Sequence, residues 1–340
     1  MTALTAALAS GLVFGSALTL SSVASPRTIK DQFRLTDFHM LLTFLTASAS
    51  SAVVIALHNS RQHATNNNKL SVKPGSTFGW FGRYDGNVIG GAMLGVGMAL
   101  TGACPGTMLV QAAAEVGRSR LLIFGGLVAG IAFVKWKERR ICQATTTTPP
   151  PPPGGKKSST VMEATGWSTK ATVLTYEVAM LTIIALVTLY APRGHHYLLH
   201  PVTGGLLIGL GQASSVTLAK KPVGVSSAYE DFGKLFWWLV EGKAAPGMES
   251  IVFVAGLVAG ARLTMHLVPA TLEALAVSSA GDVSLLSALA GGFAVIFGAR
   301  LAGGCTSGHG ISGMSAMGLS SFVTVASMFG SAIGTALLVY

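Results

Sequence analysis

The sequence predicts an all-α, polytopic membrane protein of about nine transmembrane helices with short broken or re-entrant helices, in two pseudo-symmetric, inverted halves. Half of its 340 residues are hydrophobic and only 11% are charged, too few charges for a water-facing surface of this size. Nine apolar runs approach the roughly 20 residues that span a bilayer. Two glycine-rich segments, one in each half of the chain, match each other residue by residue.

The nine apolar runs define the expected spans. They cover roughly 3–22, 38–57, 87–104, 119–135, 171–190, 202–219, 250–268, 286–304 and 320–339. The first run resembles a signal peptide but lacks a basic segment before it, so we expect a structural span.

A polar segment divides the chain in two. KWKERRICQATTTTPPPPPGGKKSST begins at residue 135 and carries charges, threonines and five consecutive prolines, which favour an extended, solvated backbone. The expected organisation is an N-terminal membrane half at 1–135, a disordered linker at 136–170 and a C-terminal membrane half at 171–340. The run 171–190 is the single connecting span.

The two halves repeat each other. GGAMLGVGMALTGACPGT (90–107) and GGFAVIFGARLAGGCTSG (291–308) align without gaps and match Cys104 with Cys305. GLVFG at 11–15 likewise matches GLLIG at 205–209. Small residues recur wherever transmembrane helices pack closely, but a matched cysteine at the same position argues against chance.

A single span between two four-span repeats predicts that the halves have opposite orientations, as in many transporters. If 171–190 instead lies on the membrane surface, the repeats are parallel. On this arrangement fifteen Lys and Arg lie on the side of loops 58–86, 135–170 and 219–249, against six on the other side. Positive residues collect on the cytoplasmic side, so the N-terminus and the linker are expected there.

Both matched segments break a span beside a cysteine. Pro105 disfavours helical geometry at Cys104, and glycines at 303, 304, 308 and 310 interrupt the second span. Irregular backbone at membrane depth must be buried in protein or must line a water-filled cavity, so both breaks are expected at an internal cavity. Half-helices restarting near Thr107 and Ile311 would point their first N–H groups at the cysteines, which suits an anion.

A thiol is a weak donor and a soft, polarizable group, which favours a sulfur-containing anion over sulfate. LAGGCTSGHGISG and LTGACPGT, with GLVFG and GLLIG opening the halves, resemble the YeeE/YedE family of sulphur-transport proteins over nearly the whole chain except the linker. The resemblance implies two pseudo-symmetric helical halves meeting at a central constriction, through which thiosulfate passes along cysteine thiols.

The resemblance assigns the thiol role to Cys104 and Cys305. The expected pathway residues are Cys104, Gly106, Thr107, Arg300, Cys305, Thr306, Ser307, Gly308 and His309. The chain departs from the family in its first span, where Ser21 and Ser22 stand in place of a cysteine. Cys142, at the edge of the linker, matches no motif position.

Several of these residues have simpler interpretations. The two cysteines could be inert buried thiols, and His309 could be a zinc ligand with Cys305, although hydrogen bonding within its loop is favoured over a metal site. Arg300 either attracts the anion or braces the fold. Arg262 lies mid-span, where an ionisable residue is often functional, and snorkelling or pairing with Glu241 or Asp231 accounts for it equally well. Close helix contacts explain the glycines at 125, 126, 130, 256 and 260.

The expected function is transport of a small sulfur-containing anion, with thiosulfate as the first candidate, rather than an enzymatic activity. The alternatives are a membrane sulfurtransferase that takes a persulfide on Cys305 with His309 as base, and a structural or regulatory subunit. The expected partners are the anion and the bilayer, with a cytoplasmic sulfur-acceptor protein as a further candidate. No nucleic acid, metal or cofactor is expected. The expected location is the plasma membrane, with an organelle membrane as the alternative.

Overall fold

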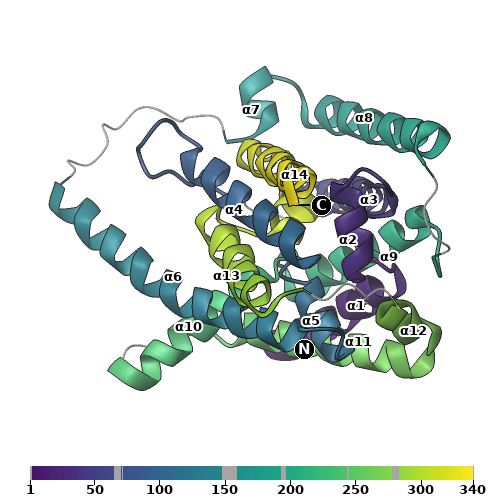
Figure 1. The fold of residues 1–340 in the computed structure, drawn as a ribbon. Helices are drawn as coiled ribbons and strands as arrows, with labels where there is room; N and C mark the ends of the chain where they lie inside the picture. The colour runs from purple at the N-terminus through teal and green to yellow at the C-terminus, as the bar shows by residue number, and fades with distance from the viewer. Residues whose placement is uncertain are drawn as a thin grey trace.

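The computed structural model describes residues 2–64, 70, 72–147, 159–192, 197–242, 245–277 and 283–339. These residues form helices and no strand, and the helices pack into one bundle (Figure 1). The all-α prediction is therefore confirmed.

Each predicted apolar run contains a helix. These helices are α1 (Ala3–Leu20), α3 (His39–Ala64), α4 (Asp85–Thr101), α6 (Ser119–Thr147), α8 (Thr169–Tyr190), α9 (Pro201–Ser214), α11 (Glu249–Leu267), α13 (Leu285–Leu301) and α14 (Leu319–Val339). Between them lie shorter elements: α2 (Pro26–Phe33), α5 (Thr107–Ala113), α7 (Val161–Thr165), α10 (Ser226–Glu241), α12 (Ala270–Val277), and the π-helical turns η1 (Ser215–Ala219) and η2 (Ser307–Gly313).

Seven helices of the described chain are long and apolar enough to cross a membrane, namely α1, α3, α6, α8, α9 with η1, α11 and α14. Helices α4 and α13 have 17 residues each, about 26 Å at 1.5 Å per residue, which is less than the hydrocarbon thickness. Both are short because a glycine break ends them.

The two breaks have the same backbone feature. Gly102 ends α4 at φ 66° and Gly303 follows α13 at φ 87°, a left-handed conformation that glycine adopts without steric cost. The first half-helix, α5, begins at Thr107 as predicted. The second begins at Ser307 rather than near Ile311, because the N–H of His309 bonds the carbonyl of Cys305 at 2.8 Å and continues the turn through the glycines.

Four helix pairs pack side by side in parallel, because contacts at one turn recur in the same direction at the next. Helices α1 and α11 meet through Gly11 on Phe253 and Gly15 on Leu257, and α3 and α9 meet through Gly205 on Thr46 and Gly209 on Ser50. Helices α4 and α14 meet through Val88 with Ser327 and Ala92 with Ser331. Helices α6 and α13 meet through Leu122 on Gly292 and Gly126 on Ile296.

Two further pairs run antiparallel. The contacts are Ser10 with Ser214 and Ser21 with Gly204 for α1 and α9, and Gly90 with Gly298 and Gly97 with Gly291 for α4 and α13. The predicted packing role of glycine is confirmed at Gly125, Gly126, Gly130, Gly256 and Gly260, where an added Cβ would collide with a neighbouring helix.

Helix α8, the predicted connecting span, lies at the edge of the bundle next to α3 (Figure 1). Its buried contact is the hydroxyl of Tyr176, which lies 2.6 Å from Ser48 Oγ of α3. Most of its apolar side chains are exposed, including Leu174 and Leu189. An exposed apolar helix of 22 residues is suited to contact with lipid.

The predicted linker at 136–170 contains helical residues at both ends. Helix α6 continues to Thr147, and α7 covers Val161–Thr165. The N–H of Val161 bonds the carbonyl of Met317 at 2.9 Å, which ties α7 to the start of α14. Residues 148–158 lie outside the described residues.

Candidate functional site

A cavity of about 50 Å³ lies between the two breaks. Helices α1, α2, α3 and α9 provide mostly apolar walls, and the polar groups come from Thr43, Cys104, Thr107, Thr306 and Ser307. No charged side chain is among the residues that line it. Sites for drug-sized ligands measure about 300–1,000 Å³, so this cavity suits a small ion.

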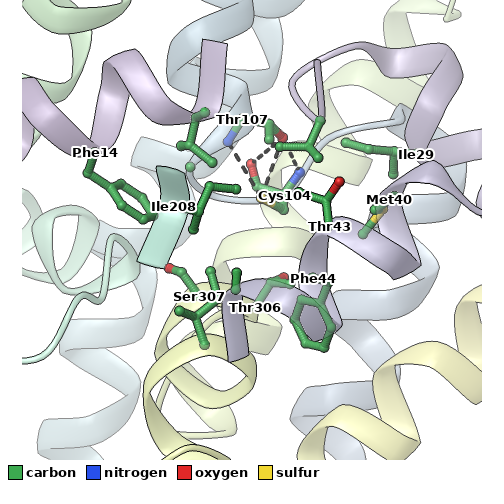
Figure 2. Close-up of a pocket in the computed structure, with 15 residues that line it drawn as sticks. Phe14, Ile29, Met40, Thr43, Phe44, Cys104, Thr107, Ile208, Thr306 and Ser307 are labelled. Atoms are coloured by element: carbon green, nitrogen blue, oxygen red, sulfur yellow. Dashed lines mark hydrogen bonds between the residues drawn. The ribbon is translucent and has the colours of Figure 1, made fainter. Parts of the chain in front are cut away.

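Cys104 and Thr107 form one side of the cavity (Figure 2). The backbone N–H of Cys104 donates to Thr107 Oγ1 at 2.7 Å, and Thr107 Oγ1 and N lie 3.4 and 3.5 Å from Cys104 Sγ. The break after α4 therefore turns the thiol and the first amide of α5 toward each other.

Thr306 and Ser307 lie across the cavity from Cys104 (Figure 2). The hydroxyl of Thr306 contacts the sulfurs of Met98 and Met328, each at 3.5 Å. Ser307 Oγ lies 3.3 Å from Cys305 Sγ. Ser307 therefore links the cavity to the second thiol.

Cys305 lies behind the cavity wall and is only 1% exposed. Its sulfur faces the backbone N–H groups of Gly308 and of Ser226, the first residue of α10. The sulfur of Cys104 is likewise faced by two amides, those of Gly106 and Thr107. Each sulfur is thus faced by two backbone amides, a setting suited to negative charge. At Cys305 one of the two comes from α10, which lies outside the predicted breaks.

Arg300 is not among the residues that line the cavity. Its guanidinium pairs with Glu230 of α10 and lies 5.6 Å from the ring centroid of Phe133. Glu230 is 3% exposed and also binds Lys137 at 3.0 Å and Lys234 at 3.3 Å. Of the two roles considered for Arg300, this geometry favours bracing α13 against α10.

His309 is buried, and both of its ring nitrogens form hydrogen bonds with neighbouring residues. Its Nδ1 lies 2.9 Å from Ser321 Oγ, and its Nε2 lies 3.1 Å from the carbonyl oxygen of Ala302. Within the described part of the chain, no group of three or more His, Cys, Asp or Glu could hold a metal ion.

Other predicted residues lie elsewhere. Arg262 pairs with Glu115 at 3.3 Å, so both partners suggested from the sequence, Glu241 and Asp231, are wrong; the true partner follows the half-helix α5. Ser21 donates to the carbonyl of Leu18 at 3.0 Å. The side chain of Cys142 lies outside the described residues.

Sequence analysis missed two residues near the breaks. Thr43 lines the cavity, and its buried hydroxyl has no hydrogen-bond partner among the described residues. Lys73 lies against Gly304 and Gly308 beside Cys305. Neither belongs to the repeated motif, and a lone lysine before Pro74 gave no signal that it enters the bundle.

A family model described as sulphur transport matches residues 20–334 of the chain. The match covers both breaks and all nine of the predicted pathway residues. No curated protein matches the chain in sequence.

Proposed function

Since the chain belongs to the sulphur-transport family, we propose that it carries a small sulfur-containing anion, thiosulfate, across the membrane through the cavity between its helix breaks. The family and the seven apolar helices identify an integral membrane protein. The proposal adds the substrate and the route.

The observation that carries the route is the pairing of thiols with amide donors on both sides of one small cavity. Cys104 lines it, and Ser307 connects it to Cys305. Weak, uncharged donors suit transport, because the site must admit the ion and then release it. A thiol can meet the terminal sulfur of thiosulfate better than the hard oxygens of sulfate.

The proposal includes two membrane halves of opposite orientation, 1–135 and 171–340, joined by α8. Support comes from the directions of packing: the matched helices α1 and α9 are antiparallel, as are α4 and α13. The parallel contacts of α1 with α11 are matched by those of α9 with α3. Helices α4 with α14 and α13 with α6 form a second matched set.

Tags test this arrangement. A tag inserted within 148–158 and a tag after the last residue should be labelled from opposite faces, the first from the cytoplasmic face. Labelling of both from one face would rule out inverted halves. Imaging of a tagged chain tests the plasma-membrane location, which is also part of the proposal.

The test of function is uptake of radiolabelled thiosulfate by liposomes that contain the purified protein. Uptake should exceed that of empty liposomes, and unlabelled thiosulfate should compete better than sulfate or sulfite. Equal competition by sulfate would contradict the thiosulfate assignment.

The sulfurtransferase alternative requires His309 to accept a proton from Cys305. Both ring nitrogens of His309 are bonded to other groups, Ser321 and Ala302, so no contact in the described chain favours this reaction. Formation of a sulfur-transfer product in detergent, where no gradient exists, would support the enzyme instead.

A further inference from the structure

The segment before α4 carries Lys73 to the break at Cys305 and holds it there. Ser320 Oγ of α14 donates to the carbonyl of Lys73 at 3.0 Å. Three residues later, Ser76 Oγ donates to the carbonyl of Leu301 at 2.6 Å. These contacts fix the segment over the end of α13 and the start of α14, so the position of Lys73 is defined by the fold.

The ammonium of Lys73 lies against the glycine-rich turn. A Cβ built on Gly304 would collide with Nζ, and one built on Gly308 would lie 2.5 Å from Nζ and 3.8 Å from Cys305 Sγ. The ammonium and the thiol therefore both lie beside Gly308, and the ammonium occupies room that a side chain at Gly304 would fill.

No carboxylate of the described residues pairs with Lys73. The charged or titratable groups that face it are Cys305, Arg300 and His309, and the guanidinium of Arg300 already pairs with Glu230. A buried cation is costly unless a negative group pairs with it, and of these three groups only Cys305 can become negative, by losing its thiol proton. An anion beside Lys73 would remove this cost.

We propose that Lys73 Nζ and Cys305 Sγ form a second anion site, one step beyond the central cavity, which binds a sulfur oxyanion by its oxygens at Lys73 and by its sulfur at Cys305. The inference rests on the proposed transport function. It adds a positively charged group to a route whose cavity has no charged residue in its lining.

This site lies on the linker side of the route. Lys73 lies against the break that follows α13 and is bonded by the first turn of α14. Helix α13 runs parallel to α6, whose end leads into the linker. An ion that passes Cys104, Ser307 and Cys305 would thus reach Lys73 last. The ammonium draws the ion from the uncharged cavity toward the cytoplasmic side.

Binding of radiolabelled thiosulfate, sulfite and sulfate to the purified full-length protein in detergent tests the site. Lys73→Gln should weaken thiosulfate binding by about tenfold or more, the usual worth of a hydrogen bond to a charged group. Lys73→Arg retains the charge and should stay within a few-fold of wild type. Lys170→Gln removes an equal charge from an exposed position on α8 and should bind as wild type does.

A second variant keeps both binding groups. Gly308→Ala places a methyl group between Nζ and Sγ and should also weaken thiosulfate binding. The double variant Lys73→Gln/Gly308→Ala should have the same affinity as the single variant that binds thiosulfate less tightly, because both changes remove the same interaction. A common loss of thermal stability in both single variants, with wild-type binding at low temperature, would mean that Lys73 only stabilises the fold.

The outcomes separate this site from the proposed function. Wild-type thiosulfate uptake with unchanged binding in Lys73→Gln would overturn the site and leave the transporter. Lys73-dependent binding of sulfite or sulfate without thiosulfate binding would keep the site and reject the substrate. Absence of binding for all three anions in the wild type would reject both.

Discussion

Replacing Arg300 distinguishes a brace from a substrate ligand. Arg300→Gln removes the partner of Glu230, which is 3% exposed, and leaves Lys137 and Lys234 at 3.0 and 3.3 Å. Breaking a buried ion pair costs about 3–5 kcal/mol. Since two cations remain, we expect a loss of about 2–3 kcal/mol in the free energy of unfolding.

The same three cations lower the pKa of Glu230. Burial alone would raise its pKa, but the charges of Arg300, Lys234 and Lys137 lower the pKa from 4.5 to about 2. This net shift corresponds to about 3 kcal/mol and combines the attraction of all three cations with the opposing cost of burial. The stabilisation is present above pH 4.5 and is lost as pH falls toward 2.

The assay is denaturant unfolding in mixed micelles, with thiosulfate binding measured on the same samples. Arg300→Gln should unfold at lower denaturant, and Glu230→Gln added to it should recover part of the loss, because the uncompensated carboxylate is then gone. Thiosulfate affinity should change less than threefold. A tenfold loss of affinity at wild-type stability would refute the brace and make Arg300 a ligand.

Two further predictions concern pH and helix packing. Burial lowers the pKa of Lys73 to about 8. Thiosulfate binding should therefore decline as pH rises from 7 to about 9 in wild type and stay level in Lys73→Arg. The same dependence of binding on pH in both proteins would show that the ammonium has no role. Gly15→Ala should cost about 1–3 kcal/mol because its Cβ would collide with the backbone of Leu257, whereas Gly334→Ala, with no atom within 4 Å, should be neutral in the same unfolding assay.

The backbone plan could be predicted because it depends on local patterns. Apolar runs, a proline and clustered glycines determine where helices form and stop, so a break beside each cysteine could be predicted. The first helix nevertheless ends at Gly102, before the predicted stop at Cys104 and Pro105. The start of η2 at Ser307 differs from the predicted start near Ile311, because the glycines do not interrupt the turn. In the structure, bonds such as His309 N–H to Cys305 carry the helix through them.

The partners of individual side chains could not be predicted. Glu230 belongs to a short amphipathic helix that has no span-like pattern. It forms an ion pair with Arg300, which lies 70 positions further along the chain. Lys73 reaches Cys305 from a polar segment before α4. Such contacts depend on how helices pack, and nothing in the local composition of either residue indicates them.

The central claim is that thiosulfate passes between the two thiols, and the most direct test is its initial rate of uptake by liposomes that contain Cys104→Ala/Cys305→Ala. Both residues lie where a span breaks and are faced by backbone amides, so alanine retains the backbone while removing the soft donors. Uptake should fall to near the level of empty liposomes, in protein whose thermal unfolding matches wild type. Uptake at the wild-type rate would show that the thiols only pack, and would contradict the mechanism.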